Sequence, residues 1–251
     1  WMVIVLAFPI LGGGLYLFIQ TNIGTIGVAK RLRHIFTSTK SFAKQDPQTL
    51  SNLLKTDKDI YNLANYVLNS RNYPIYENSK ATYYPLGENG FKEMIDQLKK
   101  AKKFIFLEYF IIEDGIMWSS ILEVLKQKVK EGVEVRVMYD GTCSIALLPI
   151  NYPKQLESFG IKVKMFAPIK PALSTHQNNR DHRKILVIDN KIAFTAGINL
   201  ADEYINQKKR FGHWKDVVIM IEGEAVSSFT LMFLQMWNIK IDKNEYEKYL
   251  K

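Results

Sequence analysis

The feature that most constrains the fold is a series of short apolar runs that alternate with amphipathic stretches between about residues 81 and 239. The run 103–112, KFIFLEYFII, is apolar at successive positions, which is typical of a central strand covered on both faces. Further strands are expected at 133–140, 161–166, 182–189, 191–196 and 216–221, and helices at about 90–102, 118–131, 152–159 and 225–239. This alternation predicts an α/β fold in which a mixed sheet is flanked by helices on both faces.

The first 20 residues are almost entirely apolar, and the first charged side chain is Lys30. A stretch of about 20 apolar residues is long enough to cross a hydrocarbon core of about 30 Å. Basic residues follow before any acidic one, and such a flank favours the cytoplasmic side of a membrane. We therefore expect residues 1–29 to form a transmembrane helix, with the rest of the chain facing the cytoplasm. A helix buried in a soluble core is the alternative.

The net charge of +9 is unevenly distributed, with +5 in residues 1–45 and +4 in the remainder. A nucleic-acid-binding domain normally carries its basic excess on the folded binding face. The observed distribution instead favours anionic membrane lipids as partners, and no nucleic acid is expected. His34 lies among the basic residues and is expected to meet lipid headgroups. The single cysteine, Cys143, excludes an internal disulfide and is expected to be a small buried residue.

A connecting region separates the apolar segment from the alternating one. Residues 47–72 carry leucine, isoleucine and valine at helical spacing and predict one or two amphipathic helices, whereas residues 74–80 are expected to be a linker. The chain is thus expected to divide into a transmembrane helix (1–29), a basic and helical connector (30–78) and a folded catalytic lobe (79–251).

The stretch 181–199, DHRKILVIDNKIAFTAGIN, carries the residues on which a functional hypothesis rests. Residues two apart on a strand share a face, so His182 and Lys184 are expected to project together. Two cations side by side favour a bound anion, and a phosphodiester fits because histidine can attack phosphorus near neutral pH. Lys184 and the amide of Asn199 could stabilise the phosphoryl oxygens, and Gly197 would let the backbone pass close by.

The pattern His-x-Lys-x4-Asp, followed by Gly-x-Asn, resembles the signature of the phospholipase D superfamily. His182, Lys184 and Asp189 match its named positions, and Gly197 and Asn199 match the glycine and asparagine after it. The position just before the glycine, where the family usually has a second small residue, is Ala196 here, which is a mild departure. Three further segments are similar to those of bacterial cardiolipin synthases: FIFLEYFII, NNRDHRKILVIDNKIAFTAGINLADEYIN and GHWKDVVIMIEG. The resemblance covers nearly the whole chain and implies a phospholipase D-like lobe in a bacterial cell membrane.

The resemblance also implies roles for single residues. His182 would be the nucleophile or its acid/base partner, Asp216 would orient it, and Asp189 would support the loop without touching substrate. Lys184, Gly197 and Asn199 would hold the phosphate. Glu108, a carboxylate within an apolar strand, is a further candidate for substrate binding, with a structural ion pair as the alternative. Asp140 ends a strand and is expected to cap a turn. His176 and His213 are weaker candidates for contact with a headgroup.

The reaction that the resemblance implies joins two phosphatidylglycerol molecules into cardiolipin and releases glycerol through a phosphohistidine, with no metal or cofactor. A hydrolytic phospholipase or nuclease is one alternative, because water and alcohols compete for the same intermediate. A non-catalytic membrane protein that retains half a site is another.

The family's site needs two copies of the motif, and this sequence contains one. We therefore expect either a missing C-terminal lobe or a second chain to complete the site. The first residue, Trp1, favours a longer protein. The fragment alone is expected to be inactive as a monomer.

Overall fold

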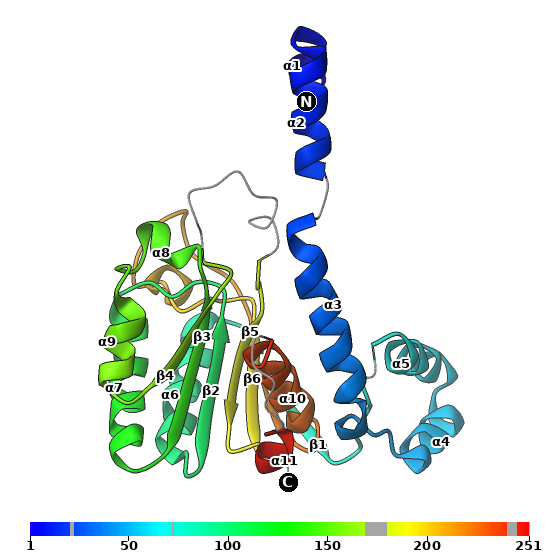
Figure 1. Cartoon of the computed structure of the whole chain (residues 1–251). Coiled ribbons are helices and arrows are strands. Elements are labelled where there is room, and N and C mark those ends of the chain that lie inside the picture. Colours follow the sequence, from blue (N-terminus) through cyan, green and yellow to red (C-terminus); the bar gives the residue numbers. More distant parts are fainter. Residues whose placement is uncertain (21–22, 72, 169–179, 240–244, 251) are drawn as a thin grey trace.

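A seven-stranded mixed sheet forms the centre of the computed structural model, which describes residues 1–20, 23–71, 73–168, 180–239 and 245–250 (Figure 1). The strands are β1 (Ser79–Tyr84), β2 (Phe104–Tyr109), β3 (Glu134–Asp140), β4 (Lys162–Phe166), β5 (Lys184–Ile188), β6 (Ile192–Ala196) and β7 (Val218–Gly223). Their spatial order is β1-β7-β6-β5-β2-β3-β4. β2, β3 and β4 pair in parallel and the other neighbours are antiparallel, so the predicted mixed sheet is confirmed.

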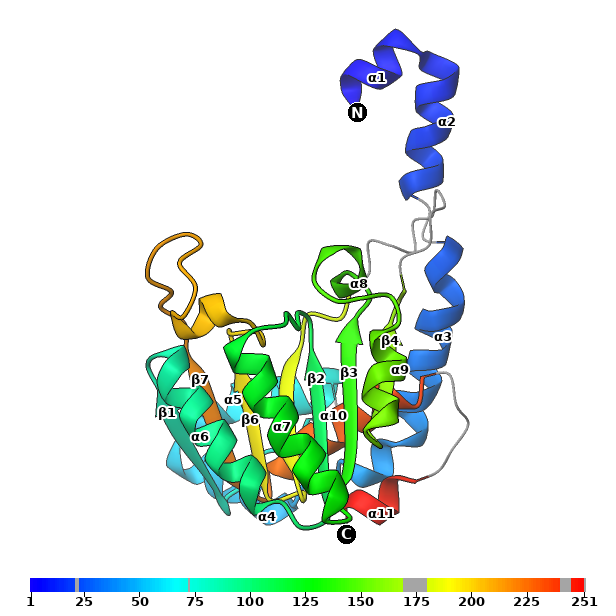
Figure 2. The ribbon, with the colours of Figure 1, turned by 90° about the vertical axis from the view of Figure 1, so that its left-hand side faces the viewer.

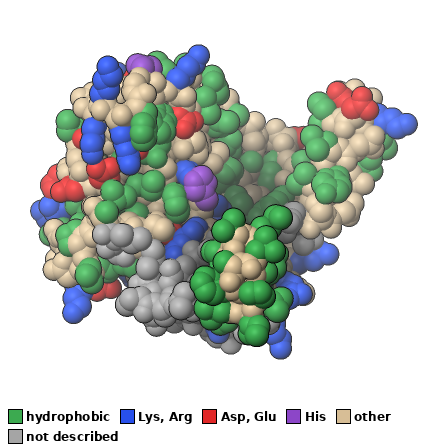
Figure 3. All heavy atoms as spheres, turned by 90° about the horizontal axis from the view of Figure 1, so that it is seen from above, with side chains coloured by type: hydrophobic (Ala, Val, Ile, Leu, Met, Phe, Trp, Pro, Cys, Tyr) green, Lys and Arg blue, Asp and Glu red, His purple; other side chains and the backbone are tan. Residues whose placement is uncertain are grey.

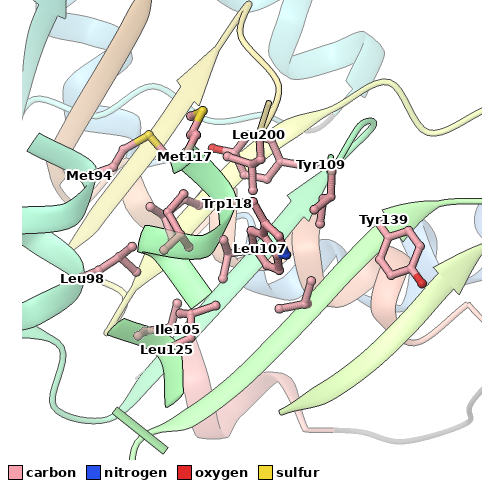
Figure 4. Close-up of a cluster of buried hydrophobic side chains, with 14 of the residues drawn as sticks. Met94, Leu98, Ile105, Leu107, Tyr109, Met117, Trp118, Leu125, Tyr139 and Leu200 are labelled. Carbon is pink, nitrogen blue, oxygen red and sulfur yellow. The ribbon is translucent and has the colours of Figure 1, made fainter. Parts of the chain in front are cut away.

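Helices cover the sheet on both faces, as the apolar runs predict. On one face lie α6 (Gly87–Lys100), α7 (Ile116–Lys130) and α9 (Tyr152–Ser158), and on the other lie α10 (Val226–Trp237) and α11 (Tyr246–Leu250) (Figure 2). All six residues of β2 are buried, because alternate side chains enter the two cores. Leu107 packs with Trp118 in the first core, shown in Figure 4, whereas Phe106 stacks on Phe233 in the second, with 4.5 Å between ring centroids.

The hairpin of β5 and β6 begins later than expected. The strand was predicted from residue 182, but the ladder of β5 starts at Lys184, so His182 precedes the strand. At the other end the predicted turn is present: Asp189 and Asn190 have φ values of 55° and 56°, and Lys191 N donates to Ile188 O. Two successive residues in the left-handed region are typical of a tight hairpin turn whose twist matches that of the strands.

Strand β1 was not predicted, since residues 74–80 were expected to be a linker. Residues Ser79–Tyr84 instead pair with Gly223–Val218 along the edge of the sheet. Four of these six side chains are exposed, and an edge strand of this kind has no apolar alternation to reveal it. Pairing with β7 rather than local preference therefore determines the strand.

The prediction of a transmembrane helix in residues 1–29 is wrong for this structure. Three helices occupy the region, α1 (Met2–Ala7), α2 (Pro9–Gln20) and α3 (Ile23–Ser38), and no helix among the described residues is both long and apolar enough to cross a membrane. The break falls at Phe8, where the backbone leaves the helical region, and Pro9 cannot donate to continue the ladder. The 12 residues of α2 span about 18 Å, less than a hydrocarbon core of about 30 Å.

The end of α3 joins the N-terminal helices to the folded lobe. Gln235 Nε2 on α10 donates to Thr39 Oγ1 at 2.9 Å, and both side chains are buried. The amphipathic region then forms two helices, α4 (Pro47–Thr56) and α5 (Lys58–Arg71), which lie beside the lobe in Figure 1, while residue 72 is outside the described residues. Asp46 caps α4 by accepting from Gln48 N at 3.0 Å.

Candidate active site

The sheet topology brings distant segments to one edge. β5 runs antiparallel to β2, so the start of β5 lies beside the end of β2. β6 ends and β7 begins at the same edge, because Ala196 pairs with Val218. His182, Gly197 and Asp216, which flank these strand ends, therefore gather where the parallel strands β2 and β3 terminate. Ligands of α/β sheets commonly bind outside this edge.

His182 and Lys184 form the centre of the candidate site. Lys184 Nζ lies 3.1 Å from His182 Nε2 and donates to the carbonyl oxygen of His182 at 2.8 Å. An ammonium group can only donate, so Nε2 is the acceptor, and in the neutral ring the proton resides on Nδ1. The ring of Phe110 packs beside both, with its centroid 4.8 Å from that of the imidazole and 5.4 Å from the ammonium. The predicted pair is therefore adjacent, although His182 precedes β5 and Lys184 Nζ contacts both its ring and its carbonyl oxygen.

The two side chains differ in exposure. His182 is exposed, whereas Lys184 is only 6% exposed. Burial lowers the pKa of Lys184, and the negative charges of Asp181 and Asp216 partly oppose this shift. A partly desolvated ammonium next to an accessible imidazole can attract an anion strongly, because little water needs to be displaced from it.

Gly197 allows Asp216 to approach this edge. A Cβ atom added at Gly197 would lie 1.9 Å from Asp216 Oδ1, so only glycine fits beneath the carboxylate. Gly197 N donates to Val217 O at 3.1 Å, and Asp216 Oδ1 accepts from Val217 N at 2.8 Å. Among the residues that the structure describes, no hydrogen bond joins Asp216 to His182, so the expectation that Asp216 orients the histidine stays a prediction.

Asn199 ties the loop after β6 to the end of β2. Its Oδ1 accepts from Ile111 N at 3.1 Å, and its Nδ2 donates to the hydroxyl of Tyr204 at 2.9 Å. The side chain is 4% exposed. A carboxamide has two N–H donors, so one remains available beyond the bond to Tyr204.

Asp189 lies at the opposite edge of the sheet. It follows Lys184 by five positions along β5, a distance of roughly 17 Å at about 3.4 Å per residue. Its carboxylate accepts from three backbone N–H groups, those of Lys102, Lys103 and Phe104, at 2.7 to 2.8 Å. The structure thus places this motif residue in the turn, where it joins the hairpin to the start of β2.

Glu108 points to the other face of the sheet from Lys184. It is fully buried and forms an ion pair with Arg183, whose guanidinium also lies 3.3 Å from Asp181. Burial raises the pKa of Glu108 well above its usual value; Arg183 opposes this shift and Asp181 adds to it. The carboxylate has no exposed surface, so its predicted contact with substrate stays a prediction that this placement does not support.

Sequence reasoning missed Asp181, Arg183, Phe110 and Tyr204. A signal for the first two was present: with Glu108 in an apolar strand, a nearby cation was required, and residues 181 and 183 alternate with the histidine and lysine. Phe110 and Tyr204 gave no such signal. Asp140, at the end of β3, accepts from Thr142 N at 2.9 Å, which is the turn role expected of it.

The remaining histidines lie elsewhere or are not described. His213 is exposed with its Nε2 3.9 Å from Glu88, His34 is an exposed residue of α3, and His176 lies outside the described residues. Cys143 is buried, as expected. In the described part of the chain, no group of three His, Cys, Asp or Glu side chains could hold a metal ion. Figure 3 views the molecule from the end at which the N-terminal helices project: apolar side chains cover much of the near end of these helices, and histidine, lysine and arginine side chains are visible on this face of the molecule.

Fold and site together define a class of protein: an α/β lobe with a histidine–lysine pair at the carboxyl edge of its sheet, suited to phosphodiester chemistry. The family model described as "Cardiolipin synthase, PLD-like domain" matches residues 94–237. The chain belongs to this family, and enzymes of the phospholipase D superfamily are phosphodiesterases or phosphatidyltransferases.

Individual relatives agree with this assignment. The chain is 51% identical over its whole length to an uncharacterized protein of Streptococcus mutans, of which it covers 54%. It is 32% identical over 95% of its length to the cardiolipin synthase of Alkalihalophilus pseudofirmus, of which it covers 48%. The chain thus spans about half the length of the curated relatives it matches.

Among solved structures, NucT from Helicobacter pylori is similar with a TM-score of 0.47 and 16% identity, over 68% of this chain and 96% of that one. A likeness of this size adds nothing to the assignment.

Proposed function

We propose that the protein is a phosphatidyltransferase that forms cardiolipin from two phosphatidylglycerol molecules and releases glycerol. The observation that carries the proposal is the His182–Lys184 pair, with 3.1 Å between Nζ and Nε2, at the carboxyl edge of the sheet in a chain of this family. The relatives named cardiolipin synthase support the choice of reaction.

In the proposed first step, a histidine nitrogen attacks the phosphorus of one phosphatidylglycerol. A nitrogen–phosphorus bond forms, the bond from phosphorus to the glycerol headgroup breaks, and a second histidine protonates the departing glycerol. In the second step, a hydroxyl of another phosphatidylglycerol loses its proton to that second histidine and attacks phosphorus, which frees the first. His182 takes one of these two parts.

Lys184 and Asn199 stabilise the negative charge that develops on the phosphoryl oxygens. Lys184 Nζ lies 3.1 Å from Nε2 of His182. An arriving phosphate competes for the ammonium, and the lone pair then becomes available for attack or proton transfer. Gly197 leaves room for the carboxylate of Asp216 at the same edge. Asp189 supports the hairpin turn at the far edge.

Completion of the site requires a second motif. We propose that a further lobe of a longer protein supplies it, in line with the half-length coverage of the relatives, and that a second copy of the chain is the alternative. The proposed lipid partners are phosphatidylglycerol and other anionic lipids. The exposed apolar side chains of α1 and α2 and the basic residues of α3 support association with a bacterial membrane surface. The expected orientation toward the cytoplasm depended on a membrane span and loses its basis with that span.

The test is product analysis of the intact gene product on vesicles of phosphatidylglycerol. We expect cardiolipin and free glycerol in equal amounts, and a His182→Asn variant that forms neither. A Glu123→Gln variant, altered at an exposed position of α7, serves as the control and should retain the wild-type rate. Release of phosphatidic acid without cardiolipin would assign a hydrolase instead, and binding without turnover would favour a non-catalytic half-site.

A further inference from the structure

The segment that carries His182 is not held by the strand ladder. β5 begins at Lys184, and the residues before it must be fixed by other contacts. These contacts come from a group of charged side chains on the face opposite the histidine–lysine pair. The group consists of Glu108, Asp140, Arg180, Asp181 and Arg183, which we call the buried charge cluster.

Within the buried charge cluster, Arg183 is the central cation. It forms the ion pair with Glu108 on β2, and its Nε lies 3.3 Å from Asp181 Oδ1. Because Arg183 stands between His182 and Lys184 in the chain, the direction of its side chain sets the direction of both neighbours. Successive side chains of an extended segment point to opposite faces, so holding Arg183 on one face directs the pair to the other.

A second set of contacts fixes the backbone just before the histidine. Asp181 N donates to Asp140 Oδ2 at 3.1 Å, and Arg180 Nη1 donates to Ala167 O at 2.8 Å. Asp140 is in turn held by Thr142 N. Side chains near the ends of β2 and β3 thereby hold residues 180–183 in place.

We propose that Glu108 is a positioning residue, which fixes the orientation of His182 and Lys184 by holding Arg183 on the opposite face of the sheet. The inference rests on the proposed function of the histidine–lysine pair. It replaces direct contact with substrate, because Glu108 is fully buried and its ion pair is with Arg183. Without this carboxylate, the guanidinium keeps only its 3.3 Å contact with Asp181, and β2 no longer holds Arg183 on the face opposite His182 and Lys184.

The test compares Glu108→Leu with Glu108→Gln in the intact gene product. Glutamine keeps the volume and an oxygen that Arg183 can approach, so kcat should stay within about threefold of wild type. Leucine removes the partner, and kcat should fall by about tenfold or more, because His182 and the phosphate-stabilising Lys184 both lose their orientation. Each variant is assayed below its own melting temperature.

A second readout reports on His182 without relying on turnover. Diethyl pyrocarbonate modifies neutral, accessible imidazoles, and peptide mass spectrometry separates His182 from His34. In Glu108→Leu the modification rate of His182 should change by about threefold or more while that of His34 does not. Glu245→Leu is the matched control, because it breaks a buried arginine pair at the opposite edge and should leave His182 as it is.

The outcomes separate the two proposals. If wild type makes no cardiolipin but the His182 rate shifts in Glu108→Leu, the proposed function fails and the positioning role stands. If wild type is active and a folded Glu108→Leu variant keeps both the kcat and the His182 rate of wild type, the positioning role is overturned. Should that variant fail to fold, Arg183→Gln takes its place with the same expectations, and wild-type values for it would equally overturn the role.

Discussion

Polar groups lie at both ends of the strands: His182 and Lys184 at the carboxyl end of β2, which we call the near edge, and Asp189 and Arg136 at the other end, the far edge. The two edges hold these groups in different ways. At the far edge, Asp189 accepts from three backbone N–H groups, and Arg136 is enclosed by Glu134, Glu245 and Tyr249. At the near edge, Lys184 is buried with a lowered pKa, and His182 stands exposed. Buried polar groups are normally fully paired, and those that are not tend to mark sites of chemistry. We therefore expect the far edge to contribute stability and the near edge to contain the reactive groups.

The largest expected effect lies at the near edge. His182→Asn should reduce the rate of phosphatidyl transfer by about 10² to 10⁴-fold, the usual contribution of a placed proton-transfer group. The melting temperature should hardly change, because the side chain is exposed. Initial rates of cardiolipin formation and thermal unfolding check both statements. Rates near wild type would break the comparison by removing the near edge from the chemistry.

The far edge should respond in stability instead. Glu245→Leu removes a partner of Arg136, which is 3% exposed and whose guanidinium is bonded to both Glu245 oxygens. The free energy of unfolding should fall by about 3 kcal/mol, the lower end for a broken buried pair, because Glu134 remains. Denaturant titration measures the loss, and a loss below about 1 kcal/mol would contradict it.

The pair of Arg136 and Glu245 also makes the free energy of unfolding depend on pH, in a direction set by the pKa shift of Glu245. Burial tends to raise the pKa of Glu245, but the hydrogen bonds and charge of Arg136 outweigh it and hold the pKa below 4.5. Its stabilising effect is therefore complete above the unfolded pKa and is lost as pH falls through the folded one. The difference in free energy of unfolding between wild type and Glu245→Leu should shrink as pH falls below about 5, by about one proton's linkage. Denaturant titrations at each pH measure this difference.

A smaller loss of stability is expected at the turn. Asp189→Ala leaves three N–H groups without their acceptor and places alanine at a φ of 55°, so the free energy of unfolding should fall by about 2 kcal/mol. Asp189→Asn, which keeps one acceptor oxygen and tolerates this conformation, should lose less. Denaturant titration orders the three proteins. A loss of kcat beyond about tenfold in folded Asp189→Ala would show that Asp189 affects the reaction as well as stability, which would contradict the contrast between the edges.

The smallest effect sharpens the near edge. The pKa of Glu108 is raised chiefly by burial, with Arg183 opposing, so ionising this carboxyl group costs more free energy in the folded state than in the unfolded chain. Stability is then lost as pH rises from about 4.5 through the raised pKa, by at most about 1.4 kcal/mol per pH unit. Glu108→Gln cannot titrate, so its stability should fall less steeply over this window. If the free energy of unfolding falls equally steeply with pH in wild type and Glu108→Gln, Glu108 is ionised throughout this pH range.

Much of the lobe was predictable because its patterns are local. The doubly apolar run of β2, the Asp-Asn turn and the adjacent His182 and Lys184 all involve residues a few positions apart. The edge strand β1 was missed because it has no apolar alternation, and the membrane span was wrong because Pro9 and the break at Phe8 divide an otherwise apolar stretch.

The sequence by itself determined which chemical groups the protein carries and which of them are neighbours in the chain. Only the tertiary structure decided that Asp189 lies away from the other motif residues, that Asp216 lies over Gly197, and that Glu108 meets Arg183. The physical reason is sequence separation. Asp189 and the N–H groups it accepts from are more than 80 residues apart, and strand register, set by burial of whole faces of the sheet, brings such groups together.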